Sequence, residues 1–114
     1  MNTIPHLENL KSISEDSLTE GQIIALDNYK ESIRHGSDKF EITSLPFEDE
    51  HIPDFVETLR KSEIKDVTIT VKHMEIISFL HSLNDLGCEM IGLDVVNWDF
   101  NAEKYKRKGI KVKL

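Results

Sequence analysis

The single cysteine, Cys88, is the first residue of the 114-residue chain to consider for covalent chemistry. A catalytic thiol needs a neighbouring base or cation, and a helix N-terminus lowers its pKa. Cys88 follows Gly87 at the predicted end of a helix and precedes Glu89, and both features raise the thiol pKa. The sequence therefore predicts a buried structural thiol. One cysteine forms no disulfide within a chain, which favours a reducing cytoplasm.

The spacing of the five histidines does not indicate a metal site. No two histidines have the i, i+4 spacing of a helical zinc site, and the sequence contains no Cys-x-x-Cys pair. His73 and Glu75 form a His-x-Glu pattern, which is common by chance, and His81 lies about two helical turns from His73. We expect no metal and no cofactor.

Acid–base catalysis would draw on the consecutive carboxylates of Glu48, Asp49 and Glu50. A run of three charges indicates solvent exposure, and carboxylates ahead of a helix serve as caps and dipole partners. No glycine-rich loop follows any predicted strand, so a nucleotide site at a helix N-terminus has no support. The sequence thus predicts a protein that is not an enzyme.

Three helices and four strands are predicted around these residues. Ser17 and Glu20 have capping-box spacing ahead of a helix over about residues 18–35, with Gly36 as its C-terminal cap. Apolar residues at i, i+3, i+4 and i+7 predict a second helix that begins near Pro53, and Gly87 closes a third. The apolar positions of the three helices are Ile23, Leu26 and Ile33, then Ile52, Phe55, Val56 and Leu59, then Ile76, Ile77, Leu80 and Leu83.

Alternating apolar and polar residues predict strands over residues 39–45, 66–71, about 88–98 and 109–114. Both faces of the third strand are partly apolar, which is typical of a strand near the middle of a sheet. We interpret Trp98 at its end as a core plug or a lid over a sheet edge. Alternating lysines mark the last strand as an exposed edge.

The order of these elements predicts an α/β fold with a two-layer, mainly parallel four-stranded sheet (α-β-α-β-α-β-β). Helices would lie mostly on one face, and the C-terminal strand would be an antiparallel edge strand. Residues 17–114 form the predicted single domain. Residues 1–16 are predicted to be a weakly structured arm, in which Leu7, Leu10 and Ile13 have the spacing of a short helix or of a docked segment.

A candidate partner surface follows from the polar side of the first two strands. Strands covered on both faces are usually apolar throughout, whereas these strands place polar residues on one face. We expect that face to stay open to solvent or lightly covered. Its members are Glu41, Thr43, Thr68 and Thr70.

Charge separates the two parts of the chain. Residues 1–66 carry 15 acidic and 7 basic side chains, whereas residues 67–114 carry 6 acidic and 7 basic ones, for a net charge of −7. An acidic body disfavours nucleic-acid binding and favours a basic partner. The basic cluster at residues 104–108 is interpreted as a solvated hairpin loop or as an intramolecular partner for the acidic half of the chain. No signal pattern or membrane-length apolar run is present, so we expect a cytoplasmic protein with no membrane association.

The segments "IPDFVETLRKSEIKDVTIT" and "LNDLGCEMIGLDVV" resemble a family of small uncharacterised acidic proteins of Gram-positive bacteria. The resemblance spans roughly residues 28–96, and such proteins are often associated with plasmids, phages or other mobile elements. It implies an accessory role in a bacterial cytoplasm. The family has no known activity, so no site residue is transferred.

Three functional hypotheses follow. The first is a non-enzymatic protein-interaction module of unknown oligomeric state, which would bind an unidentified protein through the polar sheet face or the acidic surfaces of the first two predicted helices. The second is an acidic mimic of DNA that inhibits a nucleic-acid enzyme; rows of carboxylates at phosphate-like spacing would distinguish it. The third is a small-molecule enzyme with a pocket at the C-terminal ends of the parallel strands, near Leu45, Val71 and Trp98, with His73 close by.

Overall fold

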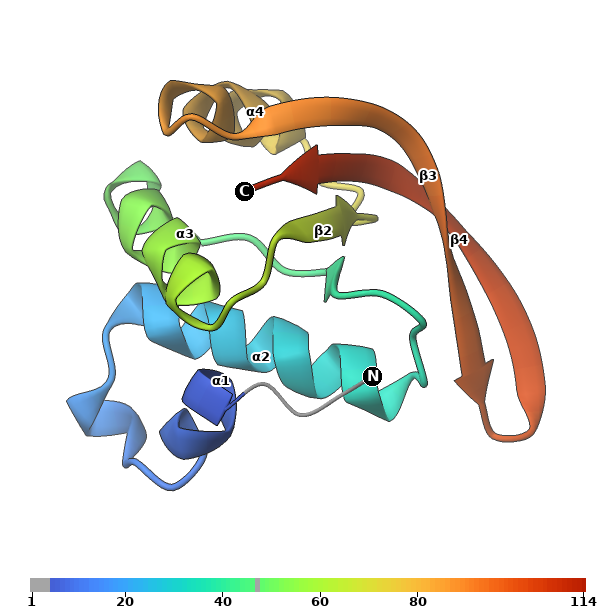
Figure 1. The fold of residues 1–114 in the computed structure, drawn as a ribbon, viewed down its shortest axis with the longest axis horizontal. Coiled ribbons are helices and arrows are strands. Elements are labelled where there is room, and N and C mark those ends of the chain that lie inside the picture. Colours follow the sequence, from blue (N-terminus) through green and yellow to red (C-terminus); the bar gives the residue numbers. More distant parts are fainter. Residues whose placement is uncertain (1–4, 47) are drawn as a thin grey trace.

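Figure 1 shows the protein as a computed structural model, which describes residues 5–46 and 48–114. Four helices and one four-stranded sheet account for most of the chain, and two single 3₁₀ turns cover Glu15–Ser17 and Asp49–His51. The helices are α1 (Pro5–Leu10), α2 (Glu20–Arg34), α3 (Ile52–Lys61) and α4 (Ile76–Asp85). The strands are β1 (Glu41–Ile42), β2 (Asp66–Ile69), β3 (Glu89–Phe100) and β4 (Glu103–Lys113).

The sheet is mixed, with the strand order β1-β2-β4-β3. Only β1 and β2 pair in parallel, whereas β4 pairs antiparallel with both β2 and β3. The prediction of a mainly parallel sheet is therefore wrong. The C-terminal strand is also not an edge strand, because β4 lies between β2 and β3, and the edge strands are β1 and β3.

A tight turn explains this order. Asn101 and Ala102 both have positive φ, at 53° and 64°, which is the backbone of a two-residue hairpin turn. The turn pairs β3 with β4 along nearly their whole lengths, and the other side of β4 pairs with β2. As a result β2 and β3 run in the same direction, as expected for strands joined through α4, but β4 lies between them.

The β3–β4 hairpin is long and strongly curved. Figure 1 shows it bending from beside α4 around the sheet to the C-terminal end of α2. The register shifts between Met90 and Gly92, which leaves Ile91 as the extra residue of a bulge, and Gly92 has φ of 151°, a conformation that favours glycine. Bulges bend a strand and increase its twist, so this irregularity helps to turn the hairpin.

The distal part of the hairpin is fastened to the connection between α2 and β1. The Asp38 amide donates to the Asn97 carbonyl at 3.1 Å, and Lys39 Nζ donates to the Val95 carbonyl at 2.6 Å. The Asp99 amide donates to the carbonyl of His35 at 3.0 Å. These contacts cover the outer edge of β3 along its second half and hold the hairpin in its curved shape.

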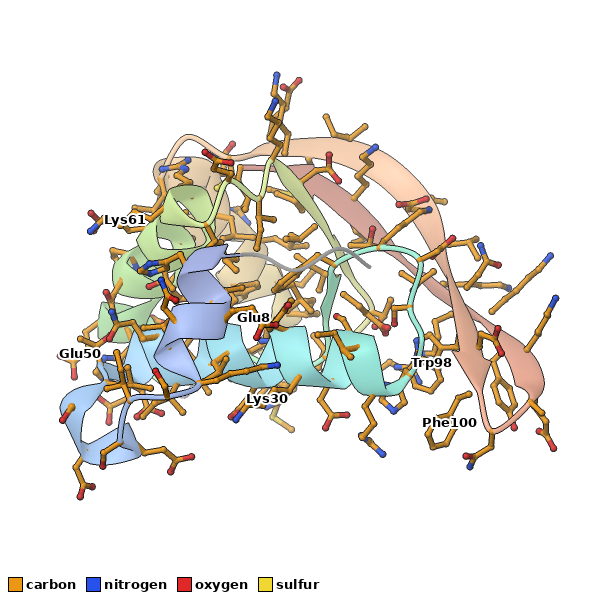
Figure 2. All side chains as sticks on the ribbon, turned by 60° about the horizontal axis from the view of Figure 1, so that its bottom comes forward. Glu8, Lys30, Glu50, Lys61, Trp98 and Phe100 are labelled. Atoms are coloured by element: carbon orange, nitrogen blue, oxygen red, sulfur yellow. The ribbon has the colours of Figure 1, made fainter. Side chains whose placement is uncertain are left out.

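Gly36 permits this close approach. Its φ is +60°, as expected for the residue after a helix, and a Cβ atom there would lie 2.3 Å from the backbone oxygen of Asp99. The imidazole of His35 stacks on Trp98 with 3.7 Å between ring centroids. Figure 2 shows Trp98 and Phe100 on the hairpin beside the end of α2. The predicted end of the helix at Gly36 is confirmed.

The apolar side of β2 and β4 belongs to one core cluster with all four helices. The predicted buried face of α3 is confirmed, since its four apolar residues are each at most 2% exposed. Ile77 of α4, predicted to be in the core, is 62% exposed, and Ile33 of α2 is also exposed. The capping box of α2 uses Thr19 and Gln22 instead of the predicted Ser17 and Glu20.

The described part of the N-terminal arm includes the short helix α1, which packs on the body of the protein. Leu7 and Leu10 are buried in the core cluster, and Glu8 accepts a hydrogen bond from Tyr29 of α2. Of the two alternatives, a short helix and a docked segment, the structure shows both features together. Ile13, the third residue of the predicted stripe, is exposed.

Candidate functional site

The predicted partner surface is the inside of the curved sheet. Glu41, Thr68 and Thr70 are 0%, 1% and 4% exposed. The expectation that this face stays open is therefore wrong, because the hairpin bends across it. The polar residues of β1 and β2 are paired with polar residues of the hairpin, so they offer no surface to a partner.

Glu41 is the centre of this buried polar cluster. Its carboxylate accepts hydrogen bonds from the Ser37 hydroxyl at 3.1 Å, the Trp98 indole Nε1 at 2.6 Å and the Thr70 hydroxyl. Nε of Arg107 lies 3.5 Å from the same carboxylate, and its guanidinium covers the Trp98 ring. A buried carboxylate is tolerated when it is paired and hydrogen-bonded in this way.

Asp94 of β3 makes a second link across the cluster. It accepts from Thr68 Oγ1 at 2.9 Å, from Lys39 Nζ at 2.7 Å and from the backbone amide of Val95 at 2.8 Å. The hydrogen bond from Lys39, with help from those of Val95 and Thr68, lowers the pKa of Asp94 to about 2. Asp94 therefore joins β2, β3 and the segment before β1 as an ionised carboxylate.

Thr43, the fourth predicted residue, lies apart from this cluster. It is half-buried, and its backbone amide donates to the Asn28 side chain of α2 at 2.7 Å. The same Asn28 oxygen accepts from the amide of Ser44 at 2.9 Å. Asn28 thus accepts hydrogen bonds from the two backbone amides that follow β1. The prediction did not identify this role, because Asn28 is a polar residue inside a helix and such residues are usually exposed.

The exposed apolar surface lies on the outside of the hairpin. Leu93 on β3 is 94% exposed, and Met74 in the loop before α4 is 91% exposed. Both line a groove of about 650 Å³, whose apolar lining also includes Ile69, Val71, Ile76 and Ile110. Single exposed apolar residues are ordinary, whereas a shared apolar groove marks an interaction site.

The apolar signal on β3 was visible in the sequence. Ile91, Leu93 and Val95 alternate with other residues, and this pattern was interpreted as a strand in the middle of a sheet. All three side chains are instead exposed on an edge strand. The pattern correctly indicated an apolar face, but it did not indicate that this face is exposed to solvent.

Basic side chains border this outer face. Lys72 and Lys108 line the groove, and Lys104, Lys106 and Lys108 alternate along β4 on the side away from Arg107. The prediction of a solvated loop at residues 104–108 is wrong, because these residues are part of β4. The side chains of all three lysines are exposed to solvent.

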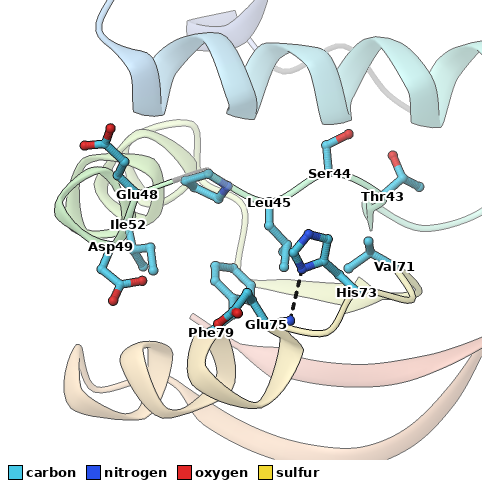
Figure 3. A pocket seen from close by; sticks show the side chains of 11 residues that line it. Thr43, Ser44, Leu45, Glu48, Asp49, Ile52, Val71, His73, Glu75 and Phe79 are labelled. Atoms are coloured by element: carbon cyan, nitrogen blue, oxygen red, sulfur yellow. Dashed lines mark hydrogen bonds between the residues drawn. The ribbon is translucent and has the colours of Figure 1, made fainter.

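The strand-end pocket of the third hypothesis is present. Leu45, Val71 and His73 line a hollow at the C-terminal ends of β1 and β2 (Figure 3). Trp98, which the prediction placed there, lies at the hairpin tip on His35. The structure thus brings together three of the four residues.

Cys88 and the acidic run behave largely as predicted. Burial raises the pKa of the Cys88 thiol, opposed by the nearby Arg60. The helix end and Glu89, named as causes from the sequence, are not the main ones. Glu48, Glu50 and His51 have ligand atoms within 4.8 Å of one another, a metal-like grouping that histidine spacing alone did not indicate. Both carboxylates are exposed, and hydrogen bonding between them raises the pKa of Glu48.

Comparison with known families places the chain in an uncharacterised group. Residues 24–114 match the family model described as a domain of unknown function, DUF7698. Because this match covers most of the chain, the protein belongs to the DUF7698 family. Searches of the curated proteins and of the solved structures found no match. Within the described residues, every helix is too short or too polar to cross a bilayer.

Proposed function

We propose that this DUF7698 protein is a protein-interaction module that binds its partner on the outer apolar groove. The observation that supports this function is the exposure of Leu93 and Met74 in one groove, at 94% and 91%. Binding an apolar side chain there would remove both residues from water. At roughly 25 cal/mol for each Å² of apolar surface buried, such contacts favour association.

The basic residues at the rim of the groove favour an acidic partner segment. Lys72 and Lys108 border it, whereas the acidic residues of the chain lie mostly in residues 1–66. A partner segment with apolar anchors and flanking carboxylates would therefore be complementary. This revises the expectation of a basic partner, which rested on the net charge of the whole chain.

The experiment is a selection of displayed random peptides on the full-length protein. Selected sequences should carry apolar anchors next to Asp or Glu. Leu93→Asp should weaken their binding by about tenfold or more, because it places a charge at the centre of an apolar contact. Ile33→Asp is the matched control, since Ile33 is an exposed apolar residue on α2 that does not line the groove.

Three outcomes would contradict the proposal: no enrichment of acidic–apolar sequences, selected peptides that bind Leu93→Asp as well as the wild type, or equal loss in both variants. Sedimentation of the unliganded protein supplies a further criterion. A wild-type dimer that Leu93→Asp converts to a monomer would show that the groove binds a second copy of the chain instead of another protein.

The other hypotheses remain predictions. The DNA-mimic alternative is less well supported, since Lys11, Arg34 and Lys61 pair with carboxylates along the helices and interrupt any continuous acidic row. A Gram-positive, mobile-element origin, a cytoplasmic location and the absence of enzymatic activity are part of the same proposal. They fit a small accessory module, and each needs its own test.

A further inference from the structure

A second surface feature, the strand-end pocket, is separate in chemistry from the apolar groove. It has a volume of about 710 Å³ and is formed by the segment after β1, the first residue of α3, the loop after β2 and one residue of α4. This volume lies in the range of small-molecule sites, about 300–1,000 Å³. The carboxyl ends of parallel strands are also where open α/β sheets commonly bind ligands.

The floor of the pocket is apolar. Ile52 and Phe79 are buried beneath it, and Leu45 and Val71 are half-buried at its sides. In Figure 3 Leu45 and Phe79 lie between the acidic end of the pocket and the imidazole of His73. An aliphatic chain or an aromatic ring would find apolar contacts on this floor.

The charged residues that line the pocket are acidic. Glu48 and Asp49 come from the segment after β1 and Glu75 from the loop after β2, and the lining contains no lysine or arginine among the described residues. Carboxylates from two separate segments thus face one hollow. An anionic ligand would be repelled there, whereas a cation would be attracted.

His73 adds a directed polar group. Its Nδ1 accepts a hydrogen bond from the Glu75 backbone amide at 3.0 Å, drawn as a dashed line in Figure 3. In the neutral ring this assigns the proton to Nε2, which is left as a donor. The imidazole can therefore orient a hydroxyl or carbonyl group of a ligand while the carboxylates hold its charge.

We propose that this pocket binds a small organic cation, an amine with an apolar aliphatic or aromatic body. The body lies on the Leu45 and Phe79 floor, and the ammonium group lies toward the carboxylates of Glu48, Asp49 and Glu75. This site adjoins the protein-binding groove, since Val71 and His73 line both, but its carboxylates and the apolar residues Leu45, Ile52 and Phe79 line the pocket alone. Its function is binding, and no covalent step is involved.

The test is a titration of the full-length, isotope-labelled protein followed by NMR. The probes are 2-phenylethylamine and hexylamine as cations, and phenylacetate as an anion of similar size and shape to the first. Both amines should give saturable shifts at Leu45, Ile52 and Phe79, which line the pocket but not the groove. Phenylacetate should bind at least about tenfold more weakly. No saturable shift at these residues with either amine, or equal binding of phenylacetate, would overturn the proposal.

Charge-removing variants test which carboxylates contribute. Asp49→Asn and Glu75→Gln should each raise the dissociation constant of 2-phenylethylamine about two- to fivefold, as expected for exposed ion pairs. Glu57→Gln is the control, because Glu57 is an acidic residue of α3 outside the pocket lining. An equal loss in the control would show a general effect of net charge and would contradict the proposed site.

Discussion

Glu41 has no solvent exposure, yet it carries a carboxylate that water would solvate in the unfolded chain. Ser37, one of its donors, is a near neighbour in the sequence, but Thr70 follows β2 and Trp98 lies on β3, 29 and 57 residues away. Such a residue cannot be recognised from local alternation, which assigns a polar side chain to solvent. Together with Arg107, these donors give Glu41 four polar partners. Because Trp98 and Arg107 belong to the hairpin, Glu41 holds the hairpin against β1.

Asp94 gives the cluster a pH dependence. Its pKa is about 2 in the folded protein, lowered chiefly by the hydrogen bond from Lys39, against 3.8 as the ordinary value. The carboxylate thus adds stability above about pH 4, and this stability is lost as the pH falls toward 2. Solvent weakens this ion pair because the Lys39 ammonium is partly exposed. We therefore expect the ionised Asp94 carboxylate to add about 1–2 kcal/mol to the free energy of unfolding.

Urea unfolding of the wild type and Asp94→Asn at several pH values measures this effect. The variant should be less stable by that amount at pH 7, and the difference should shrink between pH 4 and 2. Glu103→Gln, at the hairpin tip, is a control for removing a carboxylate outside the cluster. A constant difference across this pH range would show that Asp94 is not the titrating group.

At the scale of elements, short-range patterns predicted α3, the end of α2 and an antiparallel return of the last strand, but not the two-residue turn or the length of the hairpin. The buried stripe of α3 follows from i, i+3, i+4, i+7 spacing, and Gly36 adopts the positive φ expected of a helix end. The hairpin turn lacks the usual Asn-Gly signal, since Ala102 takes the second positive φ. The alternating lysines, read as an edge signal, belong to a strand paired on both sides.

Close contact between β2 and β4 depends on Gly109. A Cβ atom there would lie 2.5 Å from the Ile69 carbonyl oxygen and 2.9 Å from the Thr70 methyl carbon. Gly109→Ala should therefore force the two strands apart and destabilise the protein by about 1–3 kcal/mol. Denaturant unfolding checks this, with Lys108→Ala as the exposed neighbour, expected to change stability by less than about 0.5 kcal/mol. Equal stability of Gly109→Ala and wild type would contradict the packing described.

At the scale of the whole molecule, strand order was the least predictable feature. The sequence indicated correctly that β1, β2 and β3 run in one direction, because helices connect them. It did not indicate that β4 lies between β2 and β3, since that pairing joins residues 66–69 to residues 110–113. With the curl of the hairpin, this pairing encloses the polar side of the sheet as well, while the apolar side, buried under the helices at Val67 and Val112, is exposed at Leu93.

The partner groove was therefore predictable only in part. The alternation of apolar residues identified Leu93 as part of an apolar face. Leu93 is exposed because the helices that cover this face do not extend over it: α4 begins only at Ile76, after the exposed Met74. The strand-end pocket was better anticipated, because its position follows from the parallel pair of β1 and β2 alone. The pocket depends only on the two adjacent parallel strands, so the sequence predicted its position. The groove depends on how the hairpin curves around the sheet, which the sequence did not indicate.

Thr68 lies on the side of the sheet that the hairpin encloses, whereas Leu93 lies on the opposite side and is exposed beyond the helices that cover β2 and β4. Alkylation rates of single cysteines test this arrangement directly, with Thr68→Cys and Leu93→Cys each made in a Cys88→Ala background. The cysteine at position 93 should react at nearly the rate of the unfolded protein. The cysteine at position 68 should react at least about a hundredfold more slowly, through opening of the hairpin. Comparable rates at the two positions in the folded protein would contradict the account.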